Sequence, residues 1–160
     1  MARPASRVIR YVLAAVLVVA LLGLAAAGVD EGATARGETE TASIVEQVDT
    51  AAVDLYENEA LALTGTPPPQ RLLEVTLPGA GDASRAPTHV TFERVSGEAL
   101  TQVTYRFPGR VGHSRFVEAP LVREGDEEFR LDGHTGAVQL VLRLVPDENG
   151  RPVVSISVRT

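Results

Sequence analysis

One uncharged run near the amino end constrains this chain more than any other feature. Residues Tyr11–Val29 are 19 consecutive positions without a charged side chain. An α-helix rises about 1.5 Å per residue, so this run would extend about 28 Å, close to the ~30 Å hydrocarbon thickness of a bilayer. The run therefore predicts a transmembrane helix over 11–29 whose partner is the lipid bilayer.

The formal net charge of −6 is divided unevenly around this run. The first 29 residues carry +3, from Arg3, Arg7 and Arg10, whereas residues 30–160 carry −9. Basic residues collect on the cytoplasmic side of a membrane span. The pattern predicts a cytoplasmic basic segment over 1–10 and an extracytoplasmic remainder, with the protein in the cell membrane as a single-pass chain. The acidic balance argues against nucleic acid as a partner, because binding to phosphates relies on basic side chains.

A second interpretation of the same run is a cleaved signal peptide. Ala25 to Ala27 offer an A-x-A site, with cleavage before Gly28 and secretion of the mature chain. The apolar run exceeds the usual signal-peptide core of about 7–15 residues, which favours a retained anchor. Both interpretations remain open on sequence grounds.

The segment that follows divides into three parts. Residues 30–42 contain Gly32 and Gly37 among charged residues, which indicates a stalk, either flexible or a weak joint in a longer helix. Residues 43–63 predict an amphipathic helix, because apolar side chains recur at spacings of three and four (Ile44, Val48, Ala51, Ala52, Leu55 and Tyr56). Residues 64–70 contain three consecutive prolines and are interpreted as a Pro-rich linker.

From residue 71 to 160 the hydrophobic period changes to two, which is typical of strands. Short alternating runs are separated by clusters of Pro, Gly, Asp and Ser, with no helical stretch between them. This spacing predicts an extracytoplasmic antiparallel β-domain, a sheet or a sandwich. The chain as a whole is therefore expected to be α+β.

The final two strands allow a prediction of register. A three-residue loop, Glu148-Asn149-Gly150, would pair Leu144 with Val154, Leu142 with Ile156 and Leu140 with Val158, which places apolar side chains together on one face. It also places Gly150 at the left-handed position that such loops require. A two-residue Asn149-Gly150 turn would mix the faces.

No catalytic or metal-binding set emerges from the residue types. The chain has no Cys, which excludes thiolate chemistry and disulfides. His113 and Ser114 would point to opposite faces of a strand, and Asp132 with His134 supplies only two metal ligands. The acidic loops 124–128 and 147–150 lack the spacing of a calcium-binding loop. The expectation is a non-enzymatic protein with no catalytic, cofactor-binding or metal site.

The order of a basic start, an apolar helix, an amphipathic helix and a β-domain resembles the type IV pilins and pseudopilins. That resemblance covers the whole chain as architecture. It implies an apolar helix that packs in a filament core, a β-head that faces outward, and pilus or secretion-system subunits as partners.

A second resemblance is to small membrane-anchored proteins of halophilic archaea. It is carried by the N-terminal span, the Lys-free acidic remainder and the segment Gly136–Val158 (GAVQLVLRLVPDENGRPVVSISV). It implies no particular activity or cofactor. Together the two resemblances favour an accessory or minor pilin-like component of a surface or secretion apparatus. The alternative is an anchored or secreted cell-surface binding module that recognises a partner through loops such as Val111–Glu118.

Overall fold

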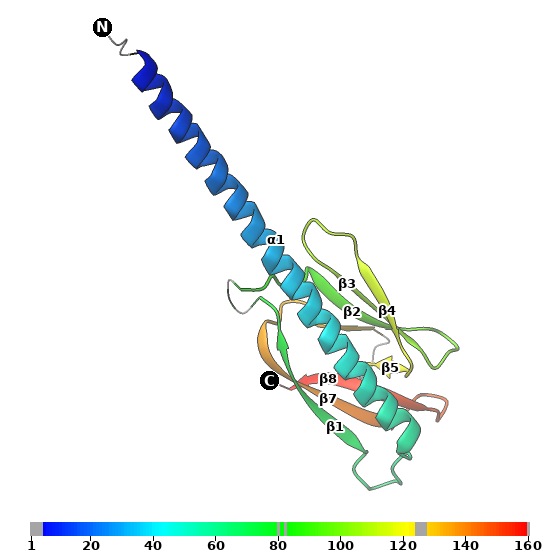
Figure 1. Cartoon of the computed structure of the whole chain (residues 1–160). Coiled ribbons are helices and arrows are strands. Elements are labelled where there is room, and N and C mark those ends of the chain that lie inside the picture. Colours follow the sequence, from blue (N-terminus) through cyan, green and yellow to red (C-terminus); the bar gives the residue numbers. More distant parts are fainter. Residues whose placement is uncertain (1–4, 80, 82, 124–127, 160) are drawn as a thin grey trace.

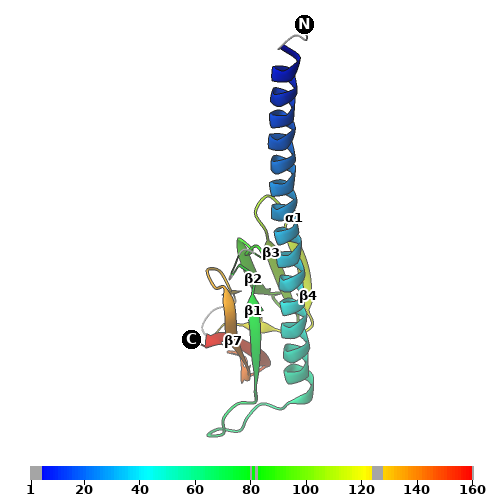
Figure 2. The same cartoon turned by 60° about the vertical axis from the view of Figure 1, so that its left-hand side comes forward.

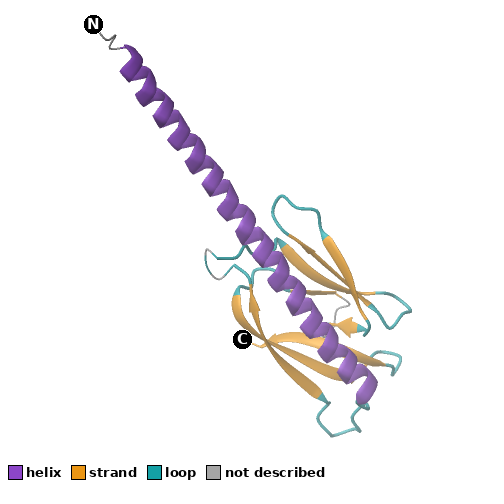
Figure 3. Cartoon of the chain, viewed as in Figure 1, coloured by secondary structure: helices purple, strands orange, loops and turns teal. Residues whose placement is uncertain are grey.

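The computed structural model describes residues 5–79, 81, 83–123 and 128–159, and it consists of one long helix followed by two β-sheets (Figures 1 and 3). Helix α1 (Ala5–Asn58) stands clear of the strands over its amino-terminal half and lies across them over its carboxy-terminal half. The expected α+β class is confirmed.

Among the residues that the structure describes, eight strands form the β-domain. They are β1 (Gln70–Leu77), β2 (His89–Arg94), β3 (Thr101–Arg106), β4 (His113–Val117), β5 (Leu121–Val122), β6 (Glu128–Arg130), β7 (Gly136–Pro146) and β8 (Pro152–Arg159). The first sheet has the order β1-β7-β8-β5 and the second has the order β4-β3-β2-β6. Neighbouring strands run antiparallel, except that β5 pairs in parallel with β8. Sequence did not predict β5, because two residues are too few to show an alternation.

The amino-terminal half of α1 has the properties of a membrane span. The large apolar side chains described in this half are well exposed, for example Val12 at 58% and Val29 at 71%. An 18-residue window in this helix has a mean hydropathy of 2.8, and none of that window is buried. A helix apolar on every side is stable where its surroundings are also apolar. The expectation of a helix long and apolar enough to cross a membrane is confirmed.

The carboxy-terminal half of α1 packs on the β-domain along one stripe. The buried positions recur every three or four residues (Thr34, Gly37, Thr41, Ile44, Val45, Val48, Ala52 and Leu55). The lower part of this stripe joins one hydrophobic cluster with side chains from both sheets, including Phe92, Phe107 and Leu142. Figure 2 shows α1 running beside β1, the edge strand that contacts it most extensively.

The course of the helix decides one open alternative and moves one boundary. The segment 30–42, interpreted as a stalk that is either flexible or a joint in a longer helix, is helical throughout, so that α1 runs without a break from the apolar half to the packed half. The amphipathic helix expected over 43–63 ends at Asn58. Beyond the end of the helix, Glu59 accepts a hydrogen bond from Arg71 of β1, and Leu61 packs against the core.

The predicted register of the last hairpin is confirmed. β7 and β8 pair Leu144 with Val154, Leu142 with Ile156 and Leu140 with Val158. Gly150 adopts a φ of 74°, the left-handed conformation that a three-residue loop needs at this position. One carboxylate oxygen of Asp147 accepts hydrogen bonds from the backbone N–H groups of Asn149 and Arg151, both at 2.9 Å, which closes the loop.

Candidate functional site

The His113–Ser114 pair occupies strand β4, and its two side chains have different partners. The His113 ring stacks on Tyr105, with ring centroids 5.2 Å apart, and its Nε2 lies 3.7 Å from a carboxylate oxygen of Glu38. The Ser114 hydroxyl instead accepts a hydrogen bond from Gln102 at 3.0 Å. The two groups therefore do not form a nucleophile–base couple.

The Asp132–His134 pair has a structural role in the β6–β7 loop. Asp132 accepts a hydrogen bond at 3.1 Å from the backbone N–H of Val90, and His134 lies 3.2 Å from the backbone carbonyl of Asp132. Within the described ranges, no group of three or more His, Asp or Glu side chains is arranged to hold a metal ion. The acidic segment 124–127 lies outside the described residues. That the chain has no enzymatic role stays a prediction.

The segment Val111–Glu118, expected to be a recognition loop, is mostly strand β4 at the edge of the second sheet. Phe116 is 60% exposed on this strand. At its end, the backbone N–H of Glu118 donates to a carboxylate oxygen of Asp49 on α1 at 3.2 Å. The segment therefore offers a fixed edge and one exposed aromatic ring.

A groove on the β-domain is lined by three arginines. Arg94, Arg123 and Arg143 line about 500 Å³ of space, together with apolar walls from Pro68, Val122, Val145, Pro146 and Val153. Its other polar lining residues are Asp147, Glu148 and Ser155. Buried Nε of Arg94 finds no hydrogen-bond partner among the residues that the structure describes.

Asp147 supplies part of the negative charge of this groove. Its carboxylate lies 3.5 Å from the Arg94 guanidinium, and the two side chains are only 13% and 19% exposed. The backbone N–H of Arg151 is the main cause that lowers the pKa of Asp147, with further contributions from Asn149 N–H and from Arg94. Asp147 is therefore ionised near neutral pH. The groove has a small excess of positive charge, because three arginines and two acidic residues line it.

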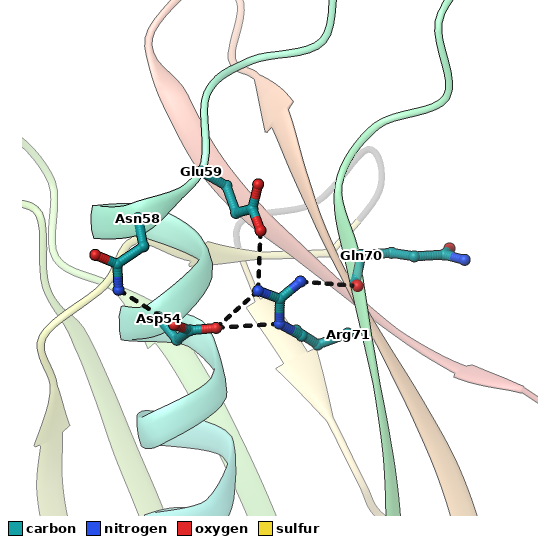
Figure 4. A network of polar contacts seen from close by, with 5 residues as sticks. All are labelled: Asp54, Asn58, Glu59, Gln70 and Arg71. Carbon is teal, nitrogen blue, oxygen red and sulfur yellow. Dashed lines mark hydrogen bonds and ion pairs between the residues drawn. The ribbon is translucent and has the colours of Figure 1, made fainter.

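The carboxy-terminal end of α1 is fastened to β1 by a polar cluster (Figure 4). Arg71 donates to Asp54 at 2.9 and 3.0 Å and to Glu59 at 2.9 Å, and Asn58 donates to Asp54 at 3.1 Å. The hydrogen bond from Asn58, followed by the one from Arg71, lowers the pKa of Asp54. Glu59, followed by Asp54, raises the pKa of Arg71. This cluster holds helix α1 and strand β1 together, and its geometry does not indicate a catalytic site.

A second polar cluster surrounds α1 at the other end of the β-domain. We call it the collar, and it comprises the β1–β2 loop residue Arg85 and the β3–β4 loop residue Arg110 with their helix partners Asp30 and Glu31. Arg85 forms an ion pair with Asp30, and Arg110 forms one with Glu31. The backbone N–H of Arg85 also donates to the carbonyl of Ala33 at 3.0 Å. Two loops distant in sequence thus hold the helix where it leaves the β-domain.

Sequence reasoning missed both the groove and the collar. The three groove arginines come from the end of β2, from the residue after β5 and from β7, and only the fold brings them together. The collar was missed because 30–42 was interpreted as a stalk. Its available signal was the Asp30–Glu31 pair directly after the apolar run, which arginines of the β-domain can pair with.

Comparison with known proteins assigns the chain to a family by its sequence. No curated protein and no solved structure matches it. A family model described as "Domain of unknown function (DUF7311)" matches residues 8–159, which include the apolar helix and both sheets. The chain therefore belongs to the DUF7311 family.

Proposed function

We propose that this chain is a single-span membrane protein whose amino terminus lies in the cytoplasm and whose β-domain lies outside. In that position it serves as an accessory or minor pilin-like component of a surface or secretion apparatus. The observation that carries the proposal is the single helix α1, which is exposed and apolar over its first half and packed on a β-domain over its second half.

The charge distribution supports the orientation. Three arginines precede the apolar half, whereas Asp30 and Glu31 follow it directly, which matches the positive-inside rule. The alternative is cleavage before Gly28, which would release a secreted domain. Amino-terminal sequencing of the mature protein separates the two, because a retained anchor keeps residues 1–27 and a mature chain that starts at Gly28 contradicts it.

The continuity of α1 supports the pilin-like role. A helix that carries an apolar half rigidly on a β-domain could pack with similar helices from other subunits, because the large apolar side chains described in that half are exposed. The resemblance to type IV pilins points to the same use. The Lys-free acidic composition supports the similarity to proteins of halophilic archaea, since dense carboxylates keep a surface hydrated.

The test is photo-crosslinking in the native host. A photoreactive residue at Leu17, in the apolar half, would be compared with one at Leu63, which is 82% exposed beyond the end of α1. We expect Leu17 to capture filament subunits or an assembly platform, and Leu63 to capture neither. Unchanged surface filaments and adhesion after deletion of the gene, with no subunit captured at Leu17, would contradict the pilin-like role.

The arginine groove favours a second candidate function, a cell-surface binding module. Three arginines around a cavity with apolar walls suit a ligand that has both a negative group and an apolar part. A pull-down from solubilised membranes with the wild-type chain and with an Arg123→Gln variant separates the candidates. A partner lost only with Arg123→Gln favours the binding module, whereas filament subunits recovered with both favour the first role.

A further inference from the structure

The collar lies very close to the end of the apolar half of α1. Its helix partners Asp30 and Glu31 follow Val29 directly, and the backbone contact of Arg85 is made at Ala33. Because a helix rises about 1.5 Å per residue, Ala33 lies only about 6 Å along the axis from Val29. The polar headgroup layer of a bilayer is about 5–8 Å thick on each side. A span that ends at Val29 therefore places the collar at the depth of the lipid headgroups.

The two collar loops reach along α1 toward its amino end. Figures 1 and 2 both show the β3–β4 loop extending past its strands beside the helix. The buried side chain of Phe107 anchors the start of this loop near Gly37, and Arg110 fixes its tip to Glu31. Contacts to helix positions 31 and 37 thus fix the direction in which the loop points.

The chemistry of the collar suits a layer of lipid phosphates. The side chains of Arg85 and Arg110 remain 42% and 38% exposed although each forms an ion pair. A guanidinium has five N–H donors, so each arginine keeps donors for a phosphate oxygen. Val111, next to Arg110, is 87% exposed. The loop sequence from 107 to 113 (FPGRVGH) adds no carboxylate to Asp30 and Glu31, whose charges the two collar arginines balance.

We propose that the collar is a membrane-docking surface. Arg85 and Arg110 bind lipid headgroup phosphates, and Val111 enters the boundary between headgroups and acyl chains. The β-domain then rests on the membrane in one fixed orientation, with the arginine groove and β4 held at defined heights above it. This inference depends on the retained anchor of the proposed function, and it adds a second attachment between the β-domain and the bilayer.

The test uses the absence of tryptophan from the chain. Full-length Val111→Trp and Leu63→Trp variants, each with a single tryptophan, would be reconstituted in vesicles of phosphatidylcholine and phosphatidylglycerol that contain a headgroup spin label. Both replaced side chains are more than four-fifths exposed, so neither change disturbs the core. We expect Val111→Trp to show several-fold stronger quenching than Leu63→Trp, and a blue-shifted emission.

The phosphate contacts are tested by an Arg85→Gln/Arg110→Gln double substitution in the Val111→Trp background. Quenching should fall when both arginines are replaced. Added inorganic phosphate should not lower the quenching of the Val111→Trp chain that keeps both arginines, because the bilayer holds that chain. Equal quenching of Val111→Trp and Leu63→Trp, in chains that float with the vesicles, overturns the docking surface and leaves the anchor intact. Failure of the chains to float overturns the anchor, and this inference with it.

Discussion

Gly37 lies where α1 meets the β1–β2 loop, and its missing side chain makes that contact possible. A Cβ at this position would overlap the carbonyl oxygen of Arg85 and would lie 2.8 Å from the ring of Phe107. The same gap leaves the carbonyl of Ala33 open to the Arg85 N–H. Gly37 therefore has a packing role that outweighs the roughly 1 kcal/mol that glycine costs inside a helix.

We expect Gly37→Ala to lower the free energy of unfolding of the β-domain by about 1–3 kcal/mol, because backbone and an aromatic ring must move to admit one methyl group. Gly32→Ala is the matched control, since Gly32 lies five residues earlier in the same helix with nothing within 4 Å of its position. That control should stabilise the helix by up to about 1 kcal/mol. Thermal unfolding of both variants in detergent measures the difference, and equal effects would show that the contact at Gly37 is not formed.

Thr41 offers a stabilising change on the same face of α1. Its hydroxyl is buried and has no hydrogen-bond partner among the described residues. Thr41→Val removes this unsatisfied group at nearly constant shape, and we expect a gain of about 1 kcal/mol in the free energy of unfolding. Thr39→Val is the control, because Thr39 is exposed and should change stability by less than about 0.5 kcal/mol. Destabilisation by Thr41→Val in denaturant titration would indicate an undetected partner for the hydroxyl.

At the scale of elements, the polar cluster that fastens α1 to β1 makes stability depend on pH. Hydrogen bonds from Asn58 and Arg71 hold the pKa of Asp54 below its ordinary value of 3.8 in the folded chain. A carboxyl with a lowered pKa stabilises the fold fully above its unfolded pKa, and this contribution is lost as pH falls through the folded pKa. We expect Arg71→Gln to lower the melting temperature at neutral pH. The difference in melting temperature between this variant and the wild type should become smaller below about pH 4.

The matched control for Arg71→Gln is Arg143→Gln. Arg143 is another strand arginine, exposed where Arg71 is half-buried, and its side chain donates to the neutral amide of Gln70 at 3.4 Å. Its effect on the melting temperature should therefore not shrink in acid. A gap between wild type and Arg71→Gln that stays constant down to pH 2 would contradict a role for the Asp54 carboxylate.

Elements whose signals are local could be predicted from the sequence, and elements decided by distant contacts could not. The β7–β8 register follows from side-chain alternation and from Gly150, which all lie within one hairpin. The continuation of α1 through 30–42 depends on Arg85, Phe107 and Arg110, which lie some 50 to 80 residues away. Local propensity at Gly32 and Gly37 indicated a weak joint, whereas tertiary packing keeps the segment helical.

The candidate site shows the same limit more strongly. Sequence reasoning evaluated pairs that are adjacent along the chain, such as His113 with Ser114, and the structure gives those two side chains separate partners. The groove arginines come from β2, from β7 and from the residue after β5, and no spacing rule connects them. The net charge predicted only that the outer domain is acidic. The fold then brings three of its arginines together around one cavity.

At the scale of the whole molecule, the unbroken helix couples the membrane span rigidly to the β-domain, and trypsin can test this directly. The chain has no Lys, so Arg36 is the only tryptic site between Arg10 and Arg71. The Arg36 side chain is exposed, but its backbone is helical and its neighbour Gly37 is buried. Proteases need an extended backbone, so cleavage here requires local opening of α1 and of the collar contacts.

We therefore expect the fragment 37–160 to be absent from the early tryptic products of the vesicle-bound chain and to form readily after unfolding in denaturant. Ala35→Pro supplies the matched comparison, because Ala35 is exposed and a proline inside a helix costs about 3 kcal/mol or more. This variant should be cut at Arg36 early and should release the β-domain. If the wild-type chain were cut there just as fast, residues 30–42 would be a flexible stalk, and the β-domain could not be held at a fixed height above the membrane.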